Sequence, residues 1–432
     1  MNRTLAASRI GAPVATVVES LYSKWQWRAL LGATFCYLFY YTGRQTLGFA
    51  IPGIQAEFGF SKQDMGWISA VMLWGYAVGQ SINGNLGDKF GGKRMMVMGA
   101  VLSFAANWAF SFADTYLAML VIWCANGFAQ SMGFAPGSRL LSNWWGHERR
   151  GFVYGIYVGF SGFSSVIAYA LPILILGPLH LQWHSIFRIP VFLMLLGALA
   201  LWVFVKERPE DIGLKNLSEE RASDPLAADD DDMTSRSRYV SVLKSWKLYV
   251  TGISIGCQNA ARYALIVWVP VHLLGKHWAT SAVGGVNSTW ITLALPVGMA
   301  LGAISNSWVS DILFRSRRYV AIIVYMLIAA ALALFMSFFA QGNLLGLVMM
   351  FLCGFFVFGP ASSFWALCPD LFGRRQAGTA TGLLNCMSYA AAGIGEPLIG
   401  RTMDMTGQTG IIFPIVASLC LASAVTAYLI KK

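Results

Sequence analysis

The sequence predicts an all-α membrane protein in which twelve transmembrane helices form two pseudo-symmetric six-helix bundles. Of its 432 residues, 56 % are hydrophobic and only 12 % are charged, a composition too apolar for an ordinary soluble domain. Apolar runs long enough to cross a bilayer recur between short polar breaks. Landmark residues of the first half return at nearly equal distances in the second half, which indicates an internal repeat.

The apolar runs define the expected spans, since a helix needs about 20 residues to cross the hydrocarbon core. In chain order these spans are residues 27–52, 62–86, 94–112, 116–142, 151–176, 186–206, 246–272, 282–311, 319–339, 343–366, 376–400 and 411–430. Residues 1–206 are therefore expected to form an N-terminal bundle and residues 246–432 a C-terminal bundle. The polar stretch 207–245 is expected to be a flexible cytoplasmic linker.

The basic residues predict how the chain is oriented. With both termini in the cytoplasm, most of the 31 lysines and arginines lie in cytoplasmic segments. Four fall on the outer side: Lys62, Arg188, Lys276 and Arg401. This is the positive-inside pattern. Topology thus accounts for the net charge of +11, and no nucleic-acid partner is expected.

The sequence gives no indication of an enzyme, a cofactor or a metal site. The spans hold no paired carboxylates, no nucleotide motif and no metal-ligand spacing. The seven cysteines fall in or beside apolar runs without CxxC spacing, so packing is their expected role. The first apolar run is long and contains an arginine, which argues against a cleaved signal peptide.

Arg44 is energetically unfavourable in the first span, because placing a guanidinium inside a membrane helix costs roughly 2.5 kcal/mol or more of free energy. Tyr37, Tyr40 and Tyr41 precede it at helical spacing, so on a continuous helix they share its face. We expect their rings and hydroxyls to enclose the charge in a pocket.

A second arginine, Arg262, stands at the matching place in the seventh span, with Tyr263 and Trp268 after it. The two guanidiniums offer planar N–H forks suited to phosphate or carboxylate oxygens, and neither is neutralised by losing a proton. We therefore predict an anion site between Arg44 and Arg262. The alternative is that one of them pairs with Glu396, a carboxylate of the eleventh span.

The loop after the second span, from Gly84 to Arg94, follows the pattern G-x-L-x-D-(K/R)-x-G-x-(K/R) around Asp88. This pattern resembles the signature loop of the major facilitator superfamily, although a solvated turn with flanking charges has the same composition. The second half repeats it more weakly around Asp311, which three arginines follow. Asp88 and Asp311 are candidate gating residues at the cytoplasmic surface.

Further motifs, along nearly the whole chain, resemble the organophosphate:phosphate antiporters of that superfamily. They are Tyr40-Tyr41-x-x-Arg44 with Pro52, Met132 to Arg139 with Trp144-Trp145, Glu207 to Leu214, Arg262-Tyr263 with Trp268-x-Pro270, Phe358-Gly359-Pro360, Ala377 to Gly382, and Asp404. The resemblance implies a central cavity between the bundles in which Arg44 and Arg262 bind phosphate. It also implies inorganic phosphate as the counter-substrate, and a monomer is the default for the architecture.

The sequence departs from the glycerol-phosphate members of that family around the arginines. Gln80 stands where they have a lysine, Gln45 replaces another lysine, and Val267 replaces an acidic residue. A histidine of their fifth helix is absent here, where the chain has Ser161 and nearby serines. Gln80 and Ser161 are therefore candidate substrate contacts, although membrane serines more often bond their own backbone or a neighbouring helix. The arginine pair is kept, and the identity of the organic anion stays open.

Glu396 has two interpretations. Inside the membrane, its carboxylate could load and release a proton, or hold an arginine while the carrier is empty. Near the outer end of its helix, it could instead be a rim residue bonded to Arg401 or to water.

The sequence favours a transporter of a bacterial inner membrane that exchanges an organic phosphate for inorganic phosphate by alternating access. Two unpaired buried arginines make the crossing of an empty carrier unfavourable, so exchange is the expected mode. Two alternatives stay open. One is a proton-coupled symporter of an organic anion in which Glu396 titrates, and the other is a transporter-like sensor that binds a sugar phosphate.

Overall fold

The computed structural model describes residues 4–145, 147–214, 235–274, 282–283, 286–315, 317–338, 344–372 and 377–430. The N-terminal elements are α1 (Thr4–Tyr40), the 3-10 turn η1 (Tyr41–Gly43), α2 (Leu47–Phe58), α3 (Lys62–Phe90), α4 (Gly92–Phe110), α5 (Tyr116–Gln130), α6 (Phe134–Trp144), α7 (His147–Leu176), α8 (His184–Arg188), α9 (Val191–Phe204) and η2 (Pro209–Ile212). The C-terminal elements are α10 (Ser235–Lys244), α11 (Trp246–Leu274), β1 (Ala282–Val283), β2 (Val286–Asn287), α12 (Ser288–Ile312), α13 (Arg318–Phe338), α14 (Leu344–Phe358), α15 (Pro360–Phe372), α16 (Ala377–Thr406), η4 (Thr409–Ile411) and α17 (Ile412–Leu429).

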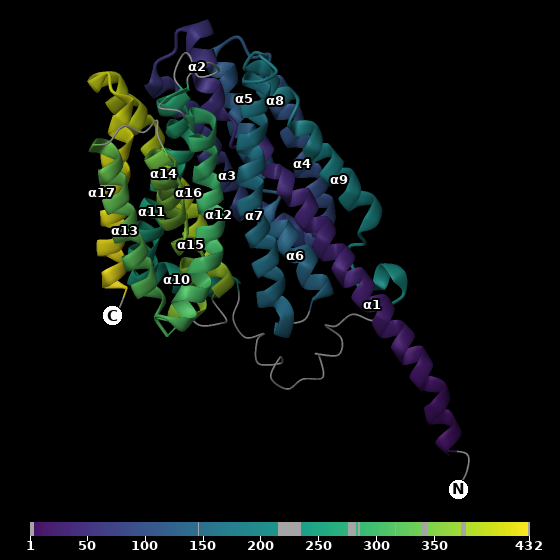
Figure 1. Ribbon diagram of the computed structural model, residues 1–432. Helices are drawn as coiled ribbons and strands as arrows, with labels where there is room; N and C mark the ends of the chain where they lie inside the picture. Colours follow the sequence, from purple (N-terminus) through teal and green to yellow (C-terminus); the bar gives the residue numbers. More distant parts are fainter. Residues whose placement is uncertain are drawn as a thin grey trace.

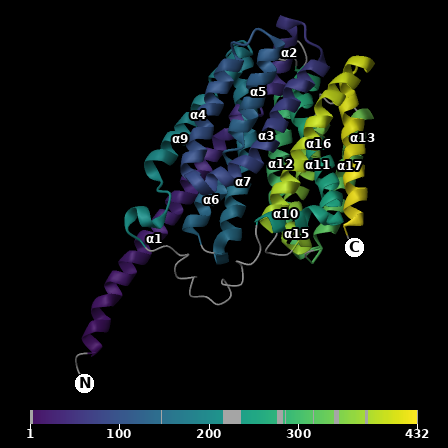
Figure 2. The same cartoon turned by 180° about the vertical axis from the view of Figure 1, so that it is seen from behind.

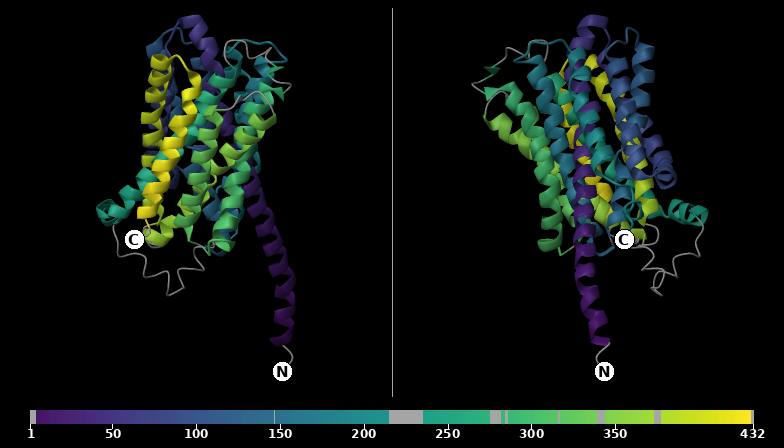
Figure 3. Two further views of the ribbon diagram at one scale, coloured as in Figure 1. Left: turned by 60° about the vertical axis from the view of Figure 1, so that its left-hand side comes forward. Right: turned by 90° about the vertical axis from the view of Figure 1, so that its right-hand side faces the viewer.

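The helices form two bundles that lie side by side (Figure 1). Helices α1 to α9, coloured purple to teal, make up one bundle, and α11 to α17, coloured green to yellow, make up the other. The end of α17 and the start of α1 lie at one end of the molecule, which we call the terminal face. Helix α2 lies at the other end, the opposite face. Figure 3 shows that α1 extends from the terminal face beyond the other helices.

Several expected spans consist of two helices rather than one. The first is broken between α1 and α2, so the expectation of one continuous helix from residue 27 to 52 is wrong. The fourth is α5 with α6, the sixth is α8 with α9, and the tenth is α14 with α15, which begins at Pro360. The eighth begins at Ser288, later than expected, because the preceding described residues form the β1–β2 hairpin. With this grouping the described helices account for the twelve expected spans.

Six stretches of the described chain reach the length and hydropathy of a membrane span on their own. They are Tyr116–Trp144, His184–Phe204, Trp290–Ile312, Arg318–Phe338, Leu344–Phe372 and Thr409–Leu429. Helices α3, α11 and α16 are outside this set although each is long. Their buried faces carry polar side chains such as Asn83, Gln258 and Glu396, which lower the mean hydropathy. Polar residues in membrane helices face the interior of a bundle, and this is where these three helices lie.

The start of α3 is fixed by local capping. Ser61 is the N-cap residue, and its hydroxyl accepts the backbone N–H of Asp64 at 3.0 Å while the Asp64 carboxylate accepts the N–H of Ser61. This reciprocal capping box satisfies two amides that no helical carbonyl can reach. Just before it, Gly59 ends α2 with a positive φ of 72°, a conformation that glycine adopts without strain.

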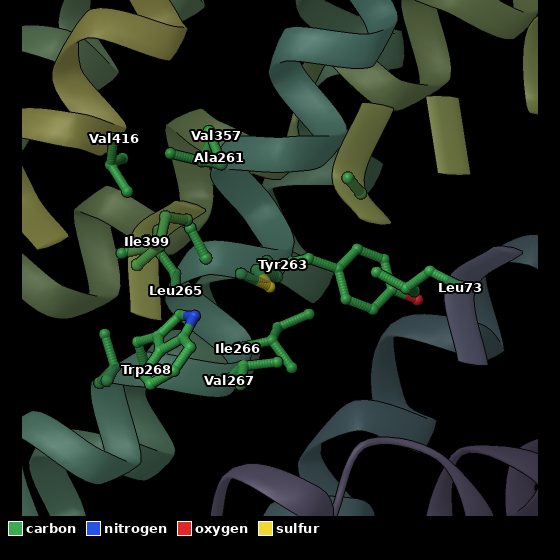
Figure 4. Close-up of a cluster of buried hydrophobic side chains, with 14 of the residues drawn as sticks. Leu73, Ala261, Tyr263, Leu265, Ile266, Val267, Trp268, Val357, Ile399 and Val416 are labelled. Carbon is green, nitrogen blue, oxygen red and sulfur yellow. The ribbon is translucent and has the colours of Figure 1, made fainter. Parts of the chain in front are cut away.

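The two bundles meet along α3 and α16, which lie side by side at the centre (Figure 2), and along α7 and α12. Near the opposite face their apolar cores are continuous. Ile51 and Leu73 of the first bundle belong to the same buried cluster as Leu265, Trp268 and Ile399 of the second. Figure 4 shows Leu73 with these residues of the second bundle. Apolar contact therefore closes the interface on that side.

Candidate functional site

Arg44 lies on a break in the first span, not on a helix. Helix α1 ends at Tyr40, a 3-10 turn follows, and Arg44 has φ −138° and ψ −24°, outside the helical region. The amides of Arg44 and Gln45 both donate to the carbonyl of Tyr41, at 3.1 and 3.0 Å. Helix α2 then starts at Leu47. Irregular backbone inside a membrane protein is tolerated where the protein itself surrounds it, as it does here.

Neighbouring helices satisfy the carbonyl that this break frees. The oxygen of Gly43 accepts hydrogen bonds from Asn126 Nδ2 at 2.7 Å and Asn107 Nδ2 at 3.1 Å. Asn126 Oδ1 accepts in turn from Ser103 Oγ at 2.6 Å. A Cβ on residue 43 would meet Gln130 Nε2 at 2.7 Å, so a larger residue here would displace the side chains of this network. This network was not predicted from the sequence, although four polar residues within otherwise apolar spans were a signal of it.

The guanidinium of Arg44 is enclosed by aromatic rings. Its Cζ lies 3.9 Å from the ring centroid of Tyr41 and 5.0 Å from that of Tyr76, and the residue is 3 % exposed. Its Nε and Nη2 have no hydrogen-bond partner among the described residues. Tyr76, on α3, was not singled out from the sequence. A buried cation over aromatic faces with unused N–H donors is a binding element for an anion.

Arg262 lies on the continuous helix α11 in the second bundle. Its Cζ is 4.1 Å from the ring centroid of Phe358 and 5.4 Å from that of Tyr263. The residue is 5 % exposed, and its Nε also lacks a partner within the described chain. Ring contacts connect the two arginines: Tyr76 lies 4.4 Å from Tyr389, and Tyr389 lies 5.8 Å from Tyr263, centroid to centroid.

A cavity of about 360 Å³ lies between the bundles. From the first bundle it is lined by Tyr37, Tyr41, Tyr76, Phe134 and Gly162, and from the second by Ile255, Gln258, Asn259, Arg262, Ala300, Ala303, Ile304, Phe358, Ala361, Ser362, Trp365, Asn385, Ser388 and Tyr389. The lining residues of α11, α12 and α16 lie at the middle of these helices or in the halves nearer the terminal face, and those of α15 lie in its first two turns. None of the described lining residues is a carboxylate, so Arg262 has no negative partner there.

Arg44 stands behind the lining of this cavity. The rings of Tyr41 and Tyr76 lie between the guanidinium and the cavity. Arg44 itself borders a second space of about 10 Å³ together with Gln45, Ser69 and others. This space is the size of one water molecule. The donors of Arg44 therefore lie at the end of the large cavity that is nearer the opposite face.

Tyr40 and Trp268 do not line the cavity, contrary to expectation. The hydroxyl of Tyr40 donates to the carbonyl of Met96, so this ring packs against α4. The indole Nε1 of Trp268 donates to Glu396 Oε2 at 3.0 Å. Figure 4 shows Tyr263 directed towards Leu73 while Trp268 lies on another side of α11. Tyr263 contacts Arg262 by its ring, as predicted, and borders the smaller space.

Glu396 is 1 % exposed, so the interpretation as a rim residue is wrong. Its Oε2 accepts from Trp268, and its Oε1 has no partner among the described residues. No ion pair joins Glu396 to either arginine in the part of the chain that the structure describes, which removes the alternative in which it neutralises one of them. Gln80 is 9 % exposed and lies one turn from Tyr76 on α3, outside the cavity lining.

The three remaining candidates from the sequence are the gating residues Asp88 and Asp311 and the substrate contact Ser161. Asp311 forms an ion pair with Arg318, whose Nη1 lies 2.6 Å from the carboxylate. Asp88 lies in the last turn of α3 and Ser161 in α7, but both side chains are outside the described part of the structure. Their proposed roles remain predictions.

The opposite-face side of the cavity is closed by direct contact between the bundles. Tyr169 Oη donates to the carbonyl of Ile266 at 2.8 Å, and a Cβ on Gly48 would meet the carbonyl oxygen of Val267 at 2.6 Å. On α3, a Cβ at Gly66 would meet the carbonyl of Glu396 at the same distance, 2.6 Å. These approaches bring the described parts of the two bundles into direct contact on this side, and we call it the closed side.

Comparisons with known proteins agree with this architecture. The model of the Major Facilitator Superfamily matches residues 33–396. The probable hexose phosphate transport protein of Chlamydia pneumoniae is 22 % identical over 427 residues, which cover 94 % of this chain and 91 % of that protein. The glycerol-3-phosphate transporter of Bacillus subtilis (strain 168) is 25 % identical over 421 residues, covering 94 % and 92 %.

Two further similarities concern a sensor and a solved structure. The membrane sensor protein UhpC of Escherichia coli (strain K12) is 23 % identical over 424 residues, which cover 96 % of this chain and 93 % of the sensor. The crystal structure of a D-xylose-proton symporter superposes with a TM-score of 0.71 at 15 % identity and covers 94 % of this chain and 97 % of the symporter. At this identity the structural likeness concerns the fold alone.

Proposed function

Since the chain belongs to the Major Facilitator Superfamily, a family of transporters, we propose that it carries an organic phosphate across the membrane in exchange for inorganic phosphate. The observation that carries this proposal is a pair of buried arginines with unused N–H donors: Arg262 lines the large cavity, and Arg44 lies behind the rings of Tyr41 and Tyr76. None of the described residues lining that cavity is a carboxylate. A phosphate between the bundles would accept from both guanidiniums, and its charge would offset the cost of burying them. The hexose phosphate and glycerol-3-phosphate transporters named above support the choice of a phosphate ester.

The charge of the site also favours exchange. An empty carrier that changes state would carry two unpaired guanidiniums through a closed, dry intermediate, which is costly. A bound anion lowers that cost, so each outward crossing is coupled to an inward one. We infer that the large cavity is reached from the terminal side, which the positive-inside pattern assigns to the cytoplasm. Arg44 and Arg262 would bind the substrate from that side and, after the change of state, from the other side. We place this carrier, as a monomer, in a bacterial inner membrane.

Two other functions are each favoured by one observation. The buried carboxylate of Glu396 favours a proton-coupled symporter of an organic anion, and the similarity to a membrane sensor favours a receptor for a sugar phosphate. A symporter takes up anion into empty vesicles under a pH gradient. A sensor binds the anion but does not transport it at a useful rate.

Uptake of labelled inorganic phosphate into proteoliposomes tests the proposal. We expect uptake only into vesicles preloaded with phosphate, and loss of that uptake in Arg44→Lys and in Arg262→Lys. Lysine keeps the positive charge but lacks the planar fork that binds two phosphate oxygens at once. Equal uptake into empty and loaded vesicles contradicts exchange, and full activity of both lysine variants contradicts the arginine site.

A further inference from the structure

One wall of the large cavity carries polar side chains on the terminal side of Arg262. Gln258 and Asn259 precede Arg262 by one helical turn on α11, and both line the cavity. Ser362 and Ser388 line it from α15 and α16. A phosphate held at Arg262 would therefore place the rest of an organic ester against these four residues.

The protein itself fixes the orientation of the two amides. Gln258 Nε2 donates to the carbonyl of Val357 at 2.8 Å, and Asn259 Nδ2 donates to the carbonyl of Ser388 at 3.2 Å. A carbonyl oxygen only accepts, so the nitrogen of each amide must be the atom that faces it. The two amide oxygens have no partner among the described residues, and each remains available to the cavity.

The hydroxyl protons of the two serines are also used within the protein. Ser388 Oγ donates to the carbonyl of Asn385 at 2.9 Å, and Ser362 Oγ donates to Asn306 Oδ1 at 3.1 Å. What these groups still offer to a ligand is lone pairs. The oxygens of this wall are therefore fixed as acceptors, and the donors that remain on the two anchored amides are one N–H each, because Gln258 and Asn259 each use the other.

We propose that Gln258 and Asn259 select phosphate esters whose tail carries hydroxyl groups and reject those whose tail carries a carboxylate. A hydroxyl can donate to a fixed amide oxygen and also accept the second amide N–H, whereas a carboxylate only accepts and leaves the amide oxygens without a donor. No described residue of this wall other than Arg262 is cationic, so nothing compensates a second negative charge. This inference rests on the proposed function, because it assigns the tail region of the same site.

Asn385 supplies a matched control within the same cavity. It is the third amide of the lining, and its side chain makes no hydrogen bond to the described residues. Its amide can turn to present either its oxygen or its nitrogen, so it can meet a hydroxyl or a carboxylate equally well. Its removal should weaken both kinds of ester to a similar extent.

The test uses two esters that differ at one carbon: glycerol 3-phosphate ends in a hydroxymethyl group and 3-phosphoglycerate in a carboxylate. The dissociation constant of each is measured by titration calorimetry on the purified full-length protein in detergent. We expect the wild type to bind glycerol 3-phosphate at least about tenfold more tightly. This ratio should fall to about threefold or less in Gln258→Met or in Asn259→Leu, and stay near the wild-type value in Asn385→Leu. Using a ratio removes the effect of a partly unfolded sample.

The outcomes separate this inference from the proposed function. Equal binding of the two esters by the wild type overturns the inference alone, and so does a ratio that holds in both the Gln258 and Asn259 variants. An equal fall in Asn385→Leu overturns the argument from fixed amides. Failure of the wild type to bind inorganic phosphate and both esters contradicts the proposed function and the inference together.

Discussion

The carboxylate of Asp404 accepts the backbone N–H of Gln63 at 2.8 Å, and through this bond the C-terminal bundle caps a helix of the N-terminal bundle. The amide of Lys62 donates to the same carboxylate at 3.2 Å, and Lys62 Nζ lies 3.6 Å from it. Asp404 is in the last turn of α16, and both amides are in the first turn of α3. A negative charge at a helix N-terminus is stabilised by the orphan amides and by the helix dipole. These contacts hold the opposite face closed and have to break when that face opens.

We expect Asp404→Ala to shift the protein towards a state that is open on the opposite face. In a background without the native cysteines, Gln45→Cys lies beyond the large cavity on the closed side. A membrane-impermeant thiol reagent added from the opposite face should label this cysteine several-fold faster when Asp404 is replaced, since each such contact contributes roughly 0.3–1 kcal/mol.

The matched control for this labelling is Asp64→Ala. Asp64 caps the same end of α3, but from within its own bundle, through Ser61. Its loss weakens the helix start without cutting a bond between the bundles. If Asp64→Ala accelerates labelling as much as Asp404→Ala, the effect comes from fraying of α3, and Asp404 does not act as a latch between the bundles.

Asn126→Leu should destabilise the protein and weaken phosphate binding together. The change keeps a similarly branched side chain but removes the 2.7 Å bond to the carbonyl of Gly43 and the acceptor for Ser103. Buried polar groups left without partners cost about 1–3 kcal/mol each, so the melting temperature in detergent should fall by several degrees. Ser142→Ala is the control, because Ser142 bonds only a carbonyl of its own helix and its loss should cost less than about 0.5 kcal/mol. Unchanged stability of Asn126→Leu would show that the break at Arg44 does not depend on this network.

The position of Arg44 could be predicted from the sequence, but the break around it could not. An arginine in an apolar run is costly unless it is buried within the protein, and Arg44 and Arg262 are both almost fully buried. The helical period continues through Tyr41 without a proline or a glycine pair. The break instead depends on Asn107 and Asn126, which reach Gly43 from other helices. The residues next to the break carry no signal of these contacts, because the bonding side chains belong to distant segments.

Part of the site prediction could have been sharper from the sequence alone. Tyr263 and Trp268 are five residues apart on one helix, which puts them on different faces, and only one of the two could adjoin Arg262. The structure places Tyr263 beside Arg262 and Trp268 beside Glu396. Tyr40 is a different case. It shares the face of Tyr37 on α1, but its hydroxyl is taken up by the carbonyl of Met96 on α4, a contact between distant segments.

Tyr41 should contribute to anion binding through its ring rather than its hydroxyl. The ring centroid lies 3.9 Å from Arg44 Cζ, so it holds the guanidinium by a cation–π contact of about 0.5–2 kcal/mol. Tyr41→Leu removes the ring and should raise the dissociation constant for inorganic phosphate by about threefold to thirtyfold. Tyr41→Phe keeps the ring and should stay within about threefold of the wild type. If the phenylalanine variant is as weak as the leucine variant, the hydroxyl, and not the ring, is the contributing group.

Glu396→Gln decides between exchange and proton coupling. Glutamine has the same shape, and its amide oxygen can still accept the Trp268 indole N–H, so the contact between α11 and α16 is retained. The substitution removes the ability to titrate. For the proposed exchanger, we expect phosphate exchange in loaded proteoliposomes to proceed at a rate similar to that of the wild type. The same rate should be found with and without an imposed pH gradient. A wild type that accumulates anion in empty vesicles under a pH gradient, together with a glutamine variant that does not, would instead identify Glu396 as the proton carrier of a symporter.

Trp268→Phe distinguishes a packing effect from titration of Glu396, because it removes the N–H donor but leaves the carboxylate. If Trp268→Phe alone abolishes transport, the contact between the two helices, rather than a proton, is what transport requires of Glu396.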